Sequence, residues 1–152
     1  MVYFWMIVAV SVDQIAKFIV KTFMELGESI PLIQDVFHLT SHRNPGAAWG
    51  ILAGQRWLLI TIAVVVVLVG SFYAKKITNR IQKLGLGLFL GGALGNVVDR
   101  VLYGEVVDFF DFRIINYPIF NTADTAIVIG GIVLALASWK EDKLNRNTRG
   151  IN

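Results

Sequence analysis

The stretch GNVVDRVLYGEVVDFFDFRIINYPIFNTAD, residues 95–124, concentrates acidic side chains in a chain that is otherwise mostly apolar. Its carboxylates are Asp99, Glu105, Asp108, Asp111 and Asp124. Long apolar segments flank the stretch, and Asp108 and Asp124 lie at the two ends of a short connection. If both flanking segments cross a membrane, the two aspartates reach the same membrane face. Carboxylates at the edge of a bilayer are costly and usually functional, so we interpret Asp108 and Asp124 as an aspartic protease dyad.

The composition is that of a membrane protein. Of 152 residues, enough for one domain, 55% are hydrophobic and 16% are charged, whereas soluble domains carry about 25% charged residues. Cysteine is absent, which excludes disulfides and thiol chemistry. We expect His38 and His42 in a polar loop, because a zinc site needs a third ligand and a helical HExxH-like context. The net charge of +3 is small, and the basic residues are topology signals rather than a nucleic-acid-binding patch.

Four apolar segments are predicted to cross the membrane as helices within a single integral membrane domain, residues 1–152. The segments are 2–20, 57–74, 84–102 and 122–139. Segment 57–74 has no charge and approaches the roughly 20 residues that cross about 30 Å of hydrocarbon. Segment 2–20 lacks the basic leading region and the cleavage site of a signal peptide. Segment 84–102 is rich in glycine, which suits close helix packing in lipid.

Two polar connections, residues 21–56 and 103–121, join these segments. The first contains VFHLTS, which has β-like character, and the strong turn signal Asn44-Pro45-Gly46. We therefore expect a small sheet on the membrane surface. The two connections carry four Lys or Arg between them, whereas the connection 75–83 and the tail 140–152 carry four each. The positive-inside rule then places both termini in the cytoplasm and both polar connections outside.

Further polar residues are expected near the two aspartates at the outer face. Asp13 and Lys17 are spaced i, i+4 and can pair, either as a snorkelling pair at a helix end or as a pair that orients the site. Asp99 and Arg100 point about 100° apart around a helix and need not pair. Arg100 can instead hold a carboxylate or a chain carbonyl. The other polar positions at this face are Asn44, Asn96 and Asn121.

Peptide hydrolysis by two carboxylates requires them to share a proton. One takes a proton from water while the other protonates the substrate carbonyl, and like charges about 3 Å apart separate the two pKa values. The residues leave other interpretations open: a carboxylate-lined proton or cation pathway, a non-enzymatic membrane assembly factor, and a role for Asp124 as a helix cap only. Asp99 can be interpreted equally well as a structural anchor or as a catalytic residue. Glu105 and Asp111 are expected to be solvated loop charges.

Five motifs resemble lipoprotein signal peptidase, also called signal peptidase II, a bacterial family. They are DQIAK (13–17), NPGAAWG (44–50), GNVVDR (95–100), GEVVDFFDF (104–112) and PIFNTADTAI (118–127). The motifs occur in order and extend over nearly the whole chain, which makes the resemblance specific.

The resemblance implies a four-helix intramembrane aspartic protease of the bacterial cytoplasmic membrane, with a small extracytoplasmic β-sheet and a short extracytoplasmic helix or lid. Its active site lies at the outer face, and it removes the signal peptide of a prolipoprotein just before the diacylglyceryl-modified cysteine. Asp108 and Asp124 would be catalytic. The residues matching the supporting or substrate-binding shell are Asp13, Lys17, Asn44, Gly46, Asn96, Asp99, Arg100, Asn121 and Ala123.

The same resemblance implies the partners. They are the lipid-modified prolipoprotein, membrane lipid and the inhibitory cyclic peptide globomycin. We expect no metal or other cofactor, no nucleic acid partner, and a monomeric protein.

Overall fold

Four long helices and a three-stranded sheet make up the computed structural model, which describes residues 1–115 and 117–149. In chain order the elements are α1 (Val2–Phe23), β1 (Ser29–Ile33), β2 (Phe37–Asn44), the short 3-10 helix η1 (Ala48–Gly50), α2 (Arg56–Ala74), α3 (Arg80–Tyr103), β3 (Val106–Phe112) and α4 (Thr122–Arg149). The four α-helices are long and apolar enough to cross a membrane. The predicted fold class, four membrane-spanning helices with a small antiparallel sheet, is confirmed.

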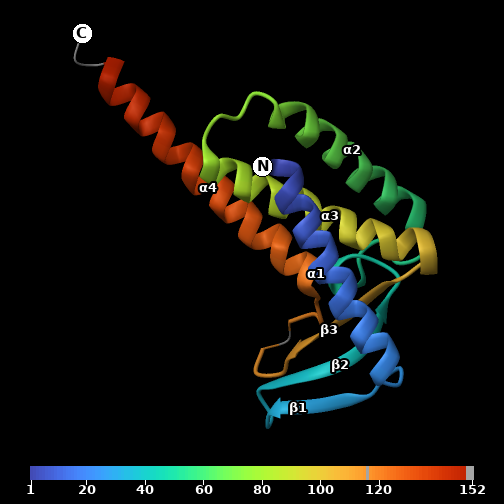
Figure 1. The fold of residues 1–152 in the computed structure, drawn as a ribbon. Coiled ribbons are helices and arrows are strands. Elements are labelled where there is room, and N and C mark those ends of the chain that lie inside the picture. Colours follow the sequence, from blue (N-terminus) through green and yellow to red (C-terminus); the bar gives the residue numbers. More distant parts are fainter. Residues whose placement is uncertain (116, 150–152) are drawn as a thin grey trace.

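The sheet lies beyond one end of the helix bundle. Figure 1 shows α1, α3 and α4 side by side, with the sheet at the end where α1 and α3 finish and α4 begins. The N-terminus and the far end of α4 lie at the opposite end. The carboxylate-bearing segment β3 is therefore at one end of the bundle, and the N-terminus and the far end of α4 are at the other.

Helix ends differ from the predicted spans because polar residues continue the helices. Helix α3 begins at Arg80 rather than residue 84, since the Asn79 side chain accepts hydrogen bonds from Ile81 N at 2.8 Å and Gln82 N at 3.4 Å. It ends at Tyr103, and the following Gly104, with a φ of +88°, closes the last turn. Helix α4 continues through the charged residues after 139 to Arg149, because a helix satisfies its own backbone hydrogen bonds in water as well as in lipid.

Helix α3 is the centre of the bundle and packs against each of the other three helices. Its glycines allow close contact with α4, as predicted. A Cβ added at Gly85 would lie 2.7 Å from Leu134 N, and one added at Gly130 would lie 2.5 Å from Phe89 N. Such distances are shorter than real Cβ contacts, so only glycine permits this approach of α3 and α4.

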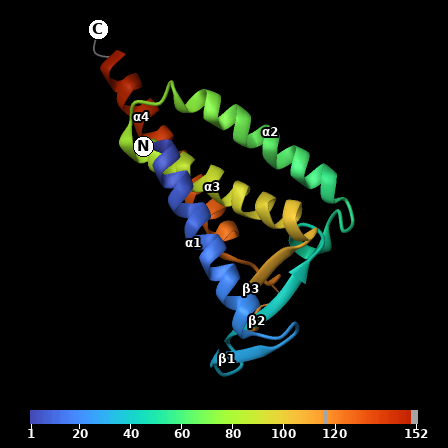
Figure 2. The ribbon, with the colours of Figure 1, turned by 45° about the vertical axis from the view of Figure 1, so that its right-hand side comes forward.

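Helix α2 lies at the edge of the bundle. It packs mainly on α3, and Figures 1 and 2 both show it separated from α4. Its contact with α1 includes a hydrogen bond of 3.4 Å from the Tyr3 hydroxyl to Ser71 O. Helix α2 is thus attached to the bundle chiefly through α3.

The sheet has β2 at its centre, antiparallel to β1 and to β3. Val107 and Phe109 of β3 are buried against Val20 of α1, which attaches the sheet to the bundle. The prediction of a polar loop for the two histidines is wrong, because both lie in β2. His38 is buried with Nδ1 3.1 Å from Ser29 Oγ, and His42 is exposed opposite Asp108.

Candidate active site

Asp108 lies in strand β3 with only 1% of its surface exposed. Its Oδ2 accepts a hydrogen bond of 2.9 Å from Asn44 Nδ2, and its Oδ1 accepts one of 2.6 Å from Asn121 Nδ2. Burial, and then the neighbouring charge of Asp124, raise the pKa of Asp108 to about 7, although the two amide donors act in the opposite direction. This carboxyl group therefore changes protonation state near neutral pH.

Asp124 lies in the first turn of α4, where Asn121 and Asp124 cap the helix reciprocally. Asn121 Oδ1 accepts from Asp124 N at 2.9 Å, and Asp124 Oδ2 accepts from Asn121 N at 3.2 Å. The other oxygen, Oδ1, accepts from Asn96 Nδ2 at 2.8 Å. Asp124 thus takes part in a helix cap, and the same geometry turns its carboxylate toward α3 and the Asp108 side.

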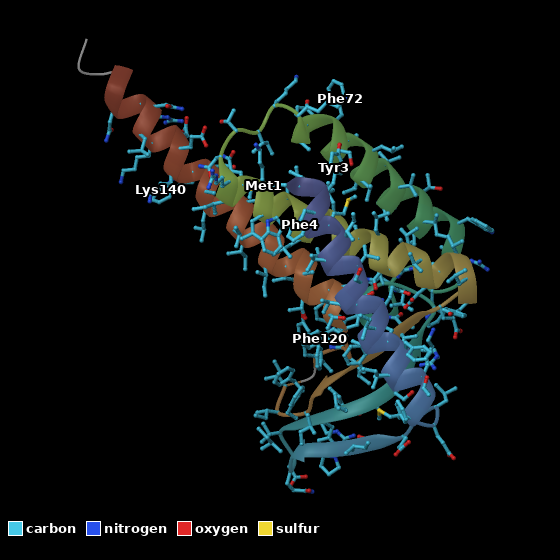
Figure 3. All side chains as sticks on the ribbon, in the orientation of Figure 1. Met1, Tyr3, Phe4, Phe72, Phe120 and Lys140 are labelled. Atoms are coloured by element: carbon cyan, nitrogen blue, oxygen red, sulfur yellow. The ribbon has the colours of Figure 1, made fainter. Side chains whose placement is uncertain are left out.

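A hollow of about 350 Å³ contains both aspartates. Polar groups of Asn44, Asn96 and Arg100 line it together with the carboxylates. Its apolar walls come from Ala47, Ala48, Leu59, Val106, Tyr117, Pro118, Ile119, Phe120, Ile127 and Val128. Figure 3 shows Phe120 where α4 begins, between the bundle and the sheet. The hollow thus combines polar groups, including both carboxylates, with apolar walls, and it lies at the end of the bundle next to the sheet.

A buried ion cluster joins α1 to α3 beneath this hollow. Lys17 Nζ lies 2.8 Å from Asp13 Oδ2 and 3.0 Å from Asp99 Oδ2, and all three side chains are 0% exposed. The snorkelling interpretation of the Asp13–Lys17 pair is therefore wrong. Lys17 also donates to Asn96 Oδ1 at 2.9 Å. An ammonium group only donates, so Lys17 fixes the Asn96 amide with its NH₂ toward Asp124.

Asp13 holds the start of α4. Its Oδ1 accepts from Ala123 N at 2.9 Å and from Thr122 Oγ1 at 2.7 Å. Ala123 is completely buried. The position of Asp124 therefore depends on a residue of α1, more than a hundred positions earlier in the chain.

Arg100 does not pair with Asp99. Its Nη2 donates to the Gly46 carbonyl and its Nη1 to Asn96 O at 3.5 Å, so the chain-carbonyl alternative for Arg100 is confirmed. Gly46 N in turn donates to Asn44 Oδ1 at 2.9 Å. Asp99 instead accepts from Val107 N at 3.0 Å, which makes it an anchor for β3 rather than a wall of the hollow.

All the predicted site residues come together in this one hydrogen-bonded network. Sequence reasoning missed Gln14, whose Nε2 donates to Asp99 Oδ1 at 3.1 Å and to Gly95 O at 3.2 Å. Its signal was a polar residue beside Asp13 within an apolar helix. The prediction of a solvated loop charge is wrong for Asp111, which lies in β3 and pairs with Arg113 at 3.1 Å. No metal-ligating group of three His, Asp or Glu occurs within residues 1–115 and 117–149.

Fold and site together define a class of protein: a membrane protein of four spanning helices with paired carboxylates where the bundle meets a small sheet. The family model described as "Signal peptidase (SPase) II" matches residues 5–140. The chain belongs to the signal peptidase II family.

Curated relatives named lipoprotein signal peptidase support this membership. The chain is 51% identical to one from Brevibacillus brevis over 91% of this chain and 95% of the relative. It is 46% identical to one from Halothermothrix orenii, over 95% of this chain and 99% of the relative. Two solved structures of bacterial membrane enzymes superimpose with TM-scores of 0.86 and 0.81, each at 38% identity. The first covers 93% of this chain and 88% of the solved chain, and the second covers 90% of each.

Family membership gives the activity. The protein is an aspartic peptidase with the function of lipoprotein signal peptidases, and a prolipoprotein is its substrate. This finding decides for a peptidase over the two alternatives that the residues left open, an ion pathway and a non-enzymatic assembly factor.

Proposed function

We propose that Asp108 and Asp124 are the catalytic dyad and that the enzyme cuts a prolipoprotein just before its diacylglyceryl-modified cysteine. One observation carries the dyad assignment. The two carboxylates come from different elements, β3 and α4, yet they line the same hollow, and Asn121 binds both of them. The surrounding shell consists of the residues named above: Asp13, Lys17, Asn44, Gly46, Asn96, Asp99, Arg100, Asn121 and Ala123.

The dyad acts as a unit that holds one proton at neutral pH, which the raised pKa of Asp108 supports. The ionised carboxylate takes a proton from a water molecule as the water oxygen attacks the scissile carbonyl carbon. The protonated carboxyl group gives its proton to the carbonyl oxygen. The tetrahedral intermediate then carries two hydroxyl groups. One of them returns its proton to the ionised carboxylate as the C–N bond breaks, and the leaving amine takes the proton of the other carboxyl group, so the dyad again holds one proton.

Arg100 and Asn44 hold the substrate backbone beside the dyad. Both line the hollow. A guanidinium has five N–H donors, and only some of those of Arg100 are occupied by Gly46 and Asn96. Donors already fixed in place stabilise charge that develops on the carbonyl oxygen. The diacylglyceryl chains remain in the bilayer beside the helices.

We assign the dyad to the outer face of the bacterial cytoplasmic membrane and both termini to the cytoplasm. Figure 3 supports this orientation, since Met1 and Lys140 lie toward the end opposite Phe120. The basic residues of 75–83 and of the α4 extension are at that end too, as the positive-inside rule requires of the cytoplasmic side. We also propose that the enzyme works as a monomer.

The segment around η1 is our candidate for the lid. Ala47 and Ala48 line the hollow, and the Trp49 ring meets the Tyr117 ring edge-on with centroids 5.8 Å apart. Trp49 is 69% exposed and adopts a φ of +56°. An exposed aromatic side chain in contact with Tyr117, which lines the hollow, is suited to cover a lipidated peptide.

A gel-shift cleavage assay tests the function. Purified enzyme is incubated with a diacylglyceryl-modified prolipoprotein, with and without globomycin. We expect a product cut just before the modified cysteine, inhibition by globomycin, and no cleavage by Asp108→Asn or Asp124→Asn. Asp35→Asn, in the exposed β1–β2 turn, is the matched control. Wild-type cleavage rates in either dyad variant would refute the dyad assignment.

A further inference from the structure

Two buried carboxylates hold the backbone beside the two proposed catalytic aspartates. Asp13 Oδ1 accepts a hydrogen bond of 2.9 Å from the N–H of Ala123, the residue before the dyad aspartate of α4. Asp99 Oδ2 accepts one of 3.0 Å from the N–H of Val107, the residue before the dyad aspartate of β3. The separation of the two dyad carboxyl groups therefore depends on how Asp13 and Asp99 are held relative to each other.

Two side chains of α1 link these carboxylates. Lys17 Nζ lies 2.8 Å from Asp13 Oδ2 and 3.0 Å from Asp99 Oδ2. Gln14 Nε2 donates to Asp13 Oδ2 at 3.2 Å and to Asp99 Oδ1 at 3.1 Å. The same amide donates to Gly95 O of α3 at 3.2 Å, so its two N–H groups are shared among three acceptors. Asp13 and Asp99 are thus bridged twice, once by a cation and once by a neutral amide.

Gln14 makes a contact that Lys17 does not duplicate. Lys17 and the Val107 N–H both bind Oδ2 of Asp99. Among the hydrogen bonds of residues 1–115 and 117–149, Gln14 is the sole donor to the other oxygen, Oδ1. Asp99 is completely buried, so bulk water supplies no substitute donor and the loss of this bond is costly. The Gln14 amide therefore sets the rotation of the Asp99 carboxylate, and with it the direction of the oxygen that holds β3.

We propose that Gln14 is a positioning residue of the peptidase, an assignment that rests on the proposed dyad. The side chain does not line the hollow that contains the dyad, so it acts through Asp13 and Asp99 rather than by contact with the substrate. Without the amide, Lys17 alone joins the two carboxylates, and the first turn of α4 and strand β3 can shift relative to each other. A small shift alters the separation of the two dyad carboxyl groups, on which the shared proton and the attack of water depend.

Three variants separate positioning from stability. Gln14→Leu removes the donor and keeps a side chain of similar size. Gln14→Glu keeps the shape, but a carboxyl group donates a hydrogen bond only while it is protonated. Gln82→Leu is the matched control, because the Gln82 amide also joins two helices, with a bond of 3.3 Å to Ser138 Oγ. Gln82 lies at the start of α3, at the end of the bundle opposite the sheet (Figure 1), and does not line the hollow that contains the dyad.

The experiment measures kcat and KM from pH 5 to pH 9 with the diacylglyceryl-modified prolipoprotein, and thermal unfolding in detergent shows whether each variant is folded at the assay temperature. We expect Gln14→Leu to lower kcat by about tenfold or more and to leave KM unchanged, because misplaced catalytic groups slow the chemical step without weakening substrate binding. Gln14→Glu should exceed Gln14→Leu in kcat at pH 5. Its kcat relative to wild type should then fall toward pH 9, as the new carboxyl group ionises and stops donating. Gln82→Leu should keep the wild-type kcat even where its melting temperature is lower.

A wild-type kcat in folded Gln14→Leu would overturn the assignment, and so would a loss confined to KM or an equal loss of kcat in Gln82→Leu. Where Gln14→Leu is unfolded at the assay temperature, Gln14→Glu decides, because a pH profile of kcat parallel to that of wild type would overturn the positioning role. Asp108→Asn is assayed alongside. Cleavage by Asp108→Asn at the wild-type rate would instead refute the proposed dyad, whatever the result at residue 14.

Discussion

At the scale of single residues, the site depends on a carboxyl group that the fold keeps out of water. Asp108 is paired with amide donors from β2 and from the start of α4, and no cation contacts it directly among the bonds of the described residues. The unfolded chain would ionise the same group near pH 3.9. Between about pH 4 and pH 7, folding therefore keeps a proton on Asp108 that the unfolded chain would lose.

This raised pKa predicts how stability changes with pH. Between about pH 4 and pH 7 the folded protein binds more protons at Asp108 than the unfolded chain does. Wild-type stability should therefore fall as pH rises through this window, by up to about 1.4 kcal/mol per pH unit, and level off above about pH 7. Asp108→Asn lacks this titration. The melting temperature of the variant minus that of wild type should therefore increase from pH 5 to pH 8. Parallel melting curves over this range would contradict the prediction.

Lys17 lies between two buried carboxylates, and its removal should strongly destabilise the folded protein. Lys17→Met leaves Asp13 and Asp99 buried without their partner, which costs about 3–5 kcal/mol in comparable sites. Unfolding in detergent should show this loss, and additional replacement of both carboxylates by Asn should recover most of it. Lys21→Met, one turn later, loses only a contact of 3.8 Å to the Tyr103 ring, worth about 1 kcal/mol or less. Similar losses for the two Lys variants would argue against the cluster.

Residue types near the site were predictable from the sequence, but their bonding was not. Polar residues in apolar segments identified Asp13, Lys17 and Asn96, since such positions are rarely tolerated without a role. The sequence left open whether Lys17 faces water or the protein interior. It also gave no sign that Lys17 fixes the Asn96 amide, because that requires the distance between two helices.

At the scale of elements, the contact between α3 and α4 decides where the first turn of α4 lies. Gly130 lies directly against the α3 backbone, whereas a Cβ at its neighbour Gly131 would meet only the Phe89 ring, at the ordinary contact distances of 3.7 and 3.9 Å. A Cβ atom is therefore excluded at residue 130 but can be accommodated at residue 131, although the two glycines are adjacent in one helix.

Gly130→Ala should destabilise the protein by about 1–3 kcal/mol, the usual cost of overpacking, and should lower activity by moving Asp124. Gly131→Ala should be neutral or stabilising, because alanine favours a helix by about 1 kcal/mol over glycine. Thermal unfolding of the two variants in the same detergent gives the comparison. Tolerance of alanine at residue 130 would show that α3 and α4 are not in tight contact.

The helices were predictable because hydropathy and length determine membrane spans almost alone. Their ends were not, since the polar extension of α4 to Arg149 has helical propensity that hydropathy does not measure. The sheet was predicted from one short segment, VFHLTS, in the first connection. The residue pattern alone did not predict β3 in the segment that holds Asp108, because the apolar pair Phe109–Phe110 interrupts its alternation, and only the family resemblance associated the second connection with the sheet.

At the scale of the whole molecule, the proposed orientation can be tested directly because the chain has no cysteine. Single cysteines introduced at Gln34, in the exposed β1–β2 turn, and at Asn145, on the exposed α4 extension, report the two ends of the bundle. In intact cells a membrane-impermeant maleimide should label residue 34 and leave residue 145 unlabelled. After permeabilisation both should react. Labelling of residue 145 in intact cells would reverse the orientation.

The spread of the site along the chain has a consequence for biosynthesis. Its parts come from α1, β2, α3, β3 and the first turn of α4, and Asp124 is positioned by hydrogen bonds from the first and third helices. The ribosome makes α4 after the other three helices. A nascent chain therefore lacks Asp124 until α4 is made, and with the proposed dyad it stays inactive until α4 has entered the membrane and docked on α1 and α3.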